Sequence, residues 1–101
     1  TMYNDYSINE SLFHWQSQST TAETSSTGQR YIHHKERGSK VLLFVREFKA
    51  DRVTGGAEAY TYLGTARYVK HEGSRPMNIT WQLDRPIPAK FLKKTNKLVV
   101  G

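Results

Sequence analysis

Apolar and polar residues alternate over several short stretches of this chain, a spacing typical of β-strands that bury one face. Residues 77–84 alternate throughout, and Ile79, Trp81 and Leu83 are predicted to face the core. Residues 40–48 contain the unbroken apolar run 41–45, so we expect a central strand that is buried on both faces. The predicted strands cover residues 11–18, 29–34, 40–48, 59–69 and 77–84.

The segments between these strands have the composition of turns and loops. Residues 17–28 are mostly Ser and Thr, and we expect a long surface loop there. A charged turn is predicted at residues 35–38 and a hairpin connection at residues 49–58.

Glycine and proline mark three further features. Gly64 indicates a bulge or a close backbone approach within its strand, while Pro86 and Pro88 end the last strand. A short helix is predicted to begin after Pro88 and to run over residues 89–94. The pattern as a whole predicts a mainly β domain: a small curved sheet or barrel with a short C-terminal helix.

Composition fits this fold and points to a polyanionic partner. The 101 residues suffice for a single domain, and they include 15 Lys and Arg against 9 Asp and Glu. Residues 1–29 contain no Lys or Arg, so residues 30–101 hold all 15 basic residues and six of the acidic ones. Such an excess favours nucleic acid, because neutralising phosphates releases counterions.

Several classes of protein are disfavoured. The chain has no Cys, which removes disulfides, thiol catalysis and Cys-based zinc sites and fits a reducing, cytoplasmic setting. No stretch approaches the roughly 20 apolar residues of a membrane span, and no signal peptide is visible. Because Thr1 precedes Met2, we expect a module excised from a larger protein.

Catalytic motifs are weak. Glu47, Phe48 and Lys49 match the E-x-K half of a metal-dependent nuclease site, but Glu36, in a charged turn, is the only nearby second carboxylate. The adjacent His33 and His34 would point to opposite faces of a strand, which argues against a shared metal ion. We therefore expect a non-catalytic module without a cofactor or metal.

The aromatic residues suit nucleic-acid binding better. Six Tyr and two Trp are interleaved with arginines, and this combination stacks bases and contacts phosphates. Trp81 and Phe44 lie in apolar runs and are interpreted as core. Trp15 adjoins the polar loop, and the residues alone leave base contact and core packing equally open for it.

Five ordered motifs resemble a known family. They are HWQSQ at 14–18, GQRY at 28–31, LLFVRE at 42–47, YTYLG at 60–64 and HEGSRP at 71–76. Over residues 12–89 the chain resembles the unknown-function domains at the C-terminal end of bacterial helicase–nuclease proteins, in which a phospholipase-D-type nuclease is joined to a superfamily-two helicase. Some of those proteins are type IV restriction enzymes that attack DNA containing 5-methylcytosine or 5-hydroxymethylcytosine.

The resemblance implies that nuclease and motor lie elsewhere in the parent chain and that this domain reads the target. By analogy, SRA-like and PUA-like readers use a curved β-barrel with a pocket for a flipped base. The candidate base-binding residues are Trp15, Gln16, Ser17, Gln18, Tyr31, Tyr60 and Tyr62. The candidate DNA-backbone contacts are Arg30, Arg46, His71 and Arg75.

Two alternatives stay open at this point. The domain could grip DNA for the helicase without reading a modification. It could instead be a regulatory or dimerisation module, in which the apolar strand 41–48 pairs with a second copy.

Overall fold

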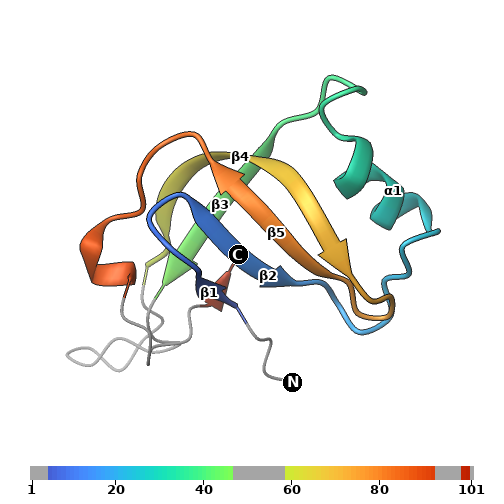
Figure 1. The fold of residues 1–101 in the computed structure, drawn as a ribbon, viewed down its shortest axis with the longest axis horizontal. Coiled ribbons are helices and arrows are strands. Elements are labelled where there is room, and N and C mark those ends of the chain that lie inside the picture. The colour runs from blue at the N-terminus through green and yellow to red at the C-terminus, as the bar shows by residue number, and fades with distance from the viewer. Residues whose placement is uncertain (1–4, 47–58, 93–98, 101) are drawn as a thin grey trace.

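The computed structural model describes residues 5–46, 59–92 and 99–100, and in this part of the chain it shows one curved antiparallel sheet (Figure 1). The strands are β1 (Tyr6–Ser7), β2 (Leu12–Gln16), β3 (Val41–Arg46), β4 (Thr61–Glu72), β5 (Asn78–Leu83) and β6 (Val99–Val100). They lie in the order β1-β2-β5-β4-β3-β6. The expected mainly β domain with a small curved sheet is confirmed.

One face of the sheet, here called the inner face, carries the core. Ile79, Trp81 and Leu83 of β5 are buried there, as their alternation predicted, opposite Phe13 of β2. Ile87 and Phe91 close one end of this core from the segment after β5. The predicted C-terminal helix is a single 3-10 turn, η1 (Ala89–Phe91), and residues 93–94 of that prediction lie outside the described residues.

Strand β3 departs from its prediction. Leu43 and Val45 are buried, but Leu42 and Phe44 point to the outer face and are 49% and 37% exposed. The prediction of a central strand buried on both faces, with Phe44 in the core, was therefore wrong. The cause is topology: β3 is next to the last strand in the sheet, and no described element covers its outer side.

Gly64 confirms the predicted bulge. Its φ is +110°, and the register between β3 and β4 shifts between Leu43 and Phe44, opposite this glycine. A second shift, between Tyr68 and Lys70, adjusts the pairing of β4 with β5. Bulges increase the local twist of a strand, and these two help the long β4 to curve across the sheet.

Residues 29–34 are not a strand, and this prediction was wrong. Helix α1 (Ser26–His33) includes most of them, and it begins where the Ser25 hydroxyl accepts a hydrogen bond from Gly28 N at 3.0 Å. The Ser/Thr-rich stretch therefore supplies a helix N-cap, a role for which these residue types are well suited. Gly28 of this helix is buried, and Tyr31 and Ile32 pack against the core. These positions have the i, i+3, i+4 spacing of a helix face, which the strand reading missed.

The segment before the helix is folded onto the sheet. The prediction of a long surface loop at residues 17–28 was therefore wrong as well. Ser17, Thr21 and Ala22 are buried. Gly28 packs so closely on this segment that an added Cβ would lie 2.2 Å from Ala22 O. In the described part of the chain, no helix has the length and apolarity needed to cross a membrane.

Candidate nucleic-acid interface

Trp15 and Tyr31, two of the predicted base-binding residues, lie together on the inner face. Their ring centroids are 5.2 Å apart and the ring planes meet at 85°. Tyr31 also meets Trp81 edge to face, at 6.2 Å and 87°. These contacts attach α1 to the sheet, and burial raises the pKa of the Tyr31 hydroxyl against the opposing effect of Arg30. Rings packed edge to face leave no parallel slot for a base between them.

The polar residues that follow Trp15 are largely engaged by the fold. Ser17 is fully buried, and its hydroxyl accepts a hydrogen bond from Met77 N at 2.8 Å, so the fold gives no support to its predicted base-reading role. The Gln16 side chain donates to Asn78 Oδ1 at 3.3 Å. Gln18 is exposed and stays a candidate.

Asp5 supports the same region from the N-terminal segment. Its carboxylate accepts a hydrogen bond from Gln16 N at 2.8 Å while remaining only 3% exposed. Burial raises the pKa of Asp5 to about 6, although the Gln16 hydrogen bond acts in the opposite direction. Asp5 is a buried acid that the sequence pattern did not single out.

His71 does not present a free ring to phosphate. Its Nε2 lies 2.7 Å from Glu23 Oε2, and its Nδ1 lies 2.7 Å from the Tyr68 hydroxyl. Burial first, and then the negative charge of Glu23, raise the pKa of Tyr68. His71 thus links β4 to the segment before α1, and its contact with a DNA phosphate stays a prediction. Arg30 and Arg75 are exposed, as a phosphate contact requires.

The outer side of β3 and β4 carries the exposed aromatics. Phe44, Tyr60 and Tyr62 are 37%, 40% and 43% exposed. The Arg46 guanidinium lies 4.5 Å from the ring centroid of Tyr60, and that of Arg85 lies 5.6 Å from the ring centroid of Tyr62. We call this surface the arginine–aromatic face, and it consists of Leu42, Phe44, Arg46, Tyr60, Tyr62 and Arg85.

Strand register assembles this face. Phe44 pairs with Tyr62, and their ring centroids are 5.0 Å apart. Arg85 arrives from the segment after β5, and a Cβ added to Gly64 would lie 3.2 Å from its Nε, so the bare glycine backbone leaves room for the guanidinium. Sequence reasoning missed Phe44 and Arg85 as surface residues; strict alternation through β3 would have indicated the first.

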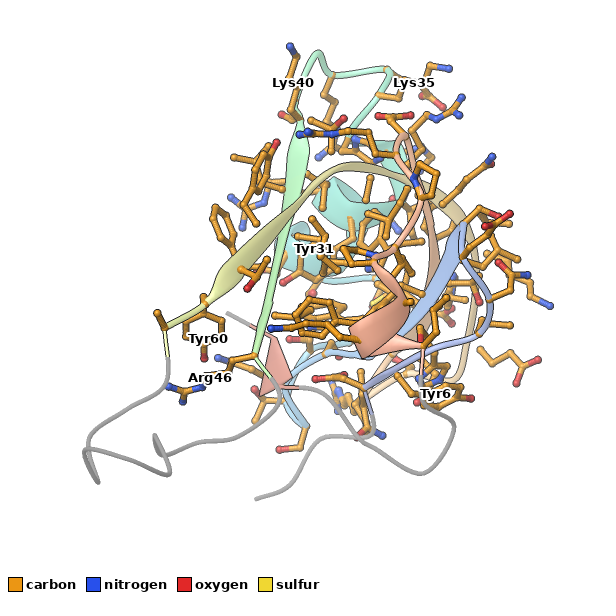
Figure 2. The ribbon with its side chains drawn as sticks, turned by 90° about the vertical axis from the view of Figure 1, so that its left-hand side faces the viewer. Tyr6, Tyr31, Lys35, Lys40, Arg46 and Tyr60 are labelled. Carbon is orange, nitrogen blue, oxygen red and sulfur yellow. The ribbon has the colours of Figure 1, made fainter. Side chains whose placement is uncertain are left out.

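A cationic groove lies at the other end of β3. It has a volume of about 390 Å³ and is lined by Lys35, Lys40 and Arg67, with His34 and Asp84 in its walls. Arg67 Nε lies 3.1 Å from Asp84 Oδ1, and the Thr65 hydroxyl donates to the same carboxylate. Figure 2 shows Lys40 and Arg46 at opposite ends of β3, with Tyr60 beside Arg46 and Tyr31 in the interior. We call this cavity the basic groove.

His34 forms a rigid wall of the basic groove. Its Nε2 accepts a hydrogen bond from Tyr68 N at 3.2 Å, and its Nδ1 lies 3.0 Å from Ser39 O. A carbonyl only accepts and a backbone N–H only donates, so Nδ1 carries the proton and Nε2 does not. The ring fixes the turn before β3 against β4, which positions Lys40.

Comparison with known families identifies the family of the chain. Residues 1–95 match the model of a family described as Domain of unknown function (DUF3427). The chain belongs to the DUF3427 family. No curated protein and no solved structure matches it.

The candidate catalytic features of this DUF3427 domain concern two parts of the chain. Glu47, Phe48 and Lys49, the E-x-K motif, lie outside the described residues. Within those residues, no three His, Asp or Glu side chains are grouped as metal ligands would be. The arginine–aromatic face and the basic groove are therefore the surfaces from which a function can be argued.

Proposed function

We propose that this DUF3427 domain binds DNA through the arginine–aromatic face. The observation that carries the proposal is the pairing of two exposed tyrosines with two arginines, Tyr60 with Arg46 and Tyr62 with Arg85, on one side of the sheet. Aromatic rings offer stacking surfaces to bases, and guanidinium groups bind phosphate through paired hydrogen bonds.

The charges near the face support an anionic partner. Asp84, the described carboxylate beside it, is already engaged by Arg67 and by the Thr65 hydroxyl. Lys35 and Lys40 extend the positive potential along β3 to the basic groove. A chain with 15 Lys and Arg against 9 Asp and Glu adds general attraction to polyanions.

We extend the proposal to target recognition within a helicase–nuclease that acts on DNA with modified cytosine. This extension rests on the family resemblance of the sequence. The base pocket first expected around Trp15 and Tyr31 receives no support from their edge-to-face packing. A modified base would therefore be met at the outer face, or at Gln18, which is exposed after the end of β2.

The test is fluorescence anisotropy with a labelled DNA of about 16 nucleotides, offered as a single strand and as a duplex, at two salt concentrations. Each form carries cytosine, 5-methylcytosine or 5-hydroxymethylcytosine. Binding to either form supports DNA contact, and a preference for a modified base supports target recognition. Equal affinities would reduce the domain to a grip for the helicase, while no binding to any form would overturn the proposal.

Variants locate the contact. Arg85→Gln removes one guanidinium from the face and should lower the slope of log affinity against log salt by about 0.7 to 0.9. Arg30→Gln tests the rival site, because Arg30 is an exposed arginine on α1 and a predicted backbone contact. Lys90→Gln is the control, because Lys90 is an exposed cation on η1 outside the predicted contacts. If Arg30→Gln lowers the DNA affinity more than Arg85→Gln does, the DNA site lies at the helix and not on the arginine–aromatic face.

Self-association is a second candidate. Among the described residues, β3 pairs with β6 only at Val45 and Arg46, while Leu42 and Phe44 expose apolar side chains beside that edge. A strand edge of this kind can pair with a second copy. Sedimentation at two protein concentrations tests this, and a mass that doubles without DNA affinity would favour the dimer.

A further inference from the structure

The arginine–aromatic face exposes several large apolar side chains side by side. Leu42, Phe44, Tyr60 and Tyr62 are each between 37% and 49% exposed on two adjacent strands. Duplex DNA presents phosphates and groove edges, because its base faces are stacked on one another. Unpaired bases present planar faces, which are the groups that an exposed aromatic ring stabilises by stacking.

The arginines fit the same partner. Arg46 and Arg85 lie over tyrosine rings, where a guanidinium can stack and also reach a phosphate. An apolar protein partner would have to bury the exposed guanidinium of Arg85, and the neighbouring Asp84 is already engaged by Arg67. Charge and apolar exposure together therefore favour a nucleic-acid strand over a protein.

The basic groove and the arginine–aromatic face together form one path along β3. From Lys40 to Arg46 an extended strand covers about 20 Å. Lys35 and Lys40 line the groove at one end of that path, and Arg46 with Tyr60 stands at the other (Figure 2). At the 3.4 Å rise of stacked nucleotides this length accommodates about six of them, and fewer if the strand is extended.

We propose that the arginine–aromatic face is a platform for single-stranded DNA. Unpaired bases stack on Phe44, Tyr60 and Tyr62, and a backbone phosphate at one end of the strand enters the basic groove beside Lys35 and Lys40. This inference rests on the proposed DNA binding and narrows it to one form of DNA.

The first experiment compares strands of one length. Anisotropy is measured with labelled oligothymidylates of 4, 6, 8 and 12 nucleotides, a 12-base-pair duplex, and a 12-mer of abasic sugars with the same phosphates. We expect the 12-mer strand to bind at least about tenfold more tightly than the duplex or the abasic strand, which is the size of one lost base stack. Affinity should rise steeply up to about six nucleotides and then level off.

The outcomes separate this inference from the proposal on which it rests. Equal or tighter binding of the duplex would overturn the platform and leave DNA binding intact. An abasic strand that binds as well as oligothymidylate would overturn base stacking. If neither strand nor duplex binds, both proposals fall.

Variants assign the two parts of the path. Tyr62→Ala should weaken the strand by about tenfold without changing the salt slope. Tyr6→Ala is its matched control, because Tyr6 is 36% exposed and lies on β1, away from Tyr60 and Arg46 in Figure 2. Lys40→Gln should lower the salt slope by about 0.7, whereas Lys90→Gln on η1 should leave it unchanged. If each variant changes DNA binding no more than its control does, the strand does not bind along this side of the sheet.

Discussion

Two groups of aromatic residues lie on opposite sides of one sheet, and they differ in what covers their rings. On the inner face, Trp81 meets Trp15, Tyr31 and Tyr68, with centroid separations between 6.2 and 6.4 Å. On the outer face, the rings of Tyr60 and Tyr62 lie under arginine guanidinium groups and stay 40% and 43% exposed.

The difference separates structural from functional aromatic residues. A ring that meets other rings edge to face in the interior contributes burial and packing to the fold. A ring on the surface beside an arginine contributes little to burial and remains accessible to a ligand. Composition gives the same residue types for both groups, so only exposure and neighbours distinguish them.

Removal of Trp81 is expected to have the largest effect on the inner group. Trp81 is 3% exposed and touches four other rings, those of Trp15, Tyr31, His34 and Tyr68. Trp81→Ala should lower the free energy of unfolding by about 3 to 5 kcal/mol, as deletion of a large buried ring does. Urea titration followed by circular dichroism measures it, and a loss below about 1.5 kcal/mol would contradict the assignment of this cluster to the core.

Asp5 adds a charge to the buried side, and it makes stability depend on pH. Its folded pKa of about 6 lies above the usual value of 3.8, so the folded protein holds the proton more tightly than the unfolded chain. Its contribution to stability is present below about pH 4 and is lost as pH rises through 6, which costs about 3 kcal/mol above that range.

Asp5→Asn should therefore stabilise the protein at pH 8 and change little near pH 3.5. Asparagine keeps an acceptor for Gln16 N, the hydrogen bond that Asp5 makes now. Urea titrations of both proteins across this pH range measure the difference. Parallel stability curves for the two proteins would show that Asp5 titrates in the folded state as it does in the unfolded chain.

The sequence predicted the elements whose pattern was local. The alternation around Ile79, Trp81 and Leu83 and the bulge at Gly64 follow from neighbouring residues, and both are confirmed. Residues 29–34 were read as a strand because their period is short and ambiguous. Helix α1 forms there because Ser25 caps it and because Tyr31 packs against Trp81, which is distant in the sequence.

The candidate site was harder to predict because exposure is a property of the whole sheet. Tyr60, Tyr62 and Arg46 were named from composition and lie on the outer face. Phe44 was assigned to the core because an apolar run does not reveal which strand will lie near the edge of a sheet. The approach of Arg85 to Gly64 is a tertiary contact, and no sequence motif predicts it.

Trp15 tests whether the inner aromatic residues are structural, because it was a candidate base contact and packs on the inner face. Its side chain is half-buried against Tyr31 and Trp81, so Trp15→Ala should lower the free energy of unfolding by about 2 kcal/mol, roughly half the cost of a fully buried ring. Measured on protein that is still folded, DNA affinity should stay within about twofold, a change of roughly 0.4 kcal/mol. An unchanged stability with a loss of DNA binding would return Trp15 to the interface.

The smallest expected effect concerns the coupling between Arg85 and Tyr62. An exposed cation–π pair contributes about 0.5 to 1 kcal/mol, and the 5.6 Å separation and 43% exposure of this pair favour the lower value. A double-mutant cycle with Arg85→Ala and Tyr62→Ala measures the coupling free energy of unfolding directly. A value near 0.5 kcal/mol means that a phosphate or a base can draw the guanidinium from the ring at little cost to the fold. A coupling above about 1.5 kcal/mol would mean that the fold itself depends on the pair, and the outer aromatics would then resemble the inner ones.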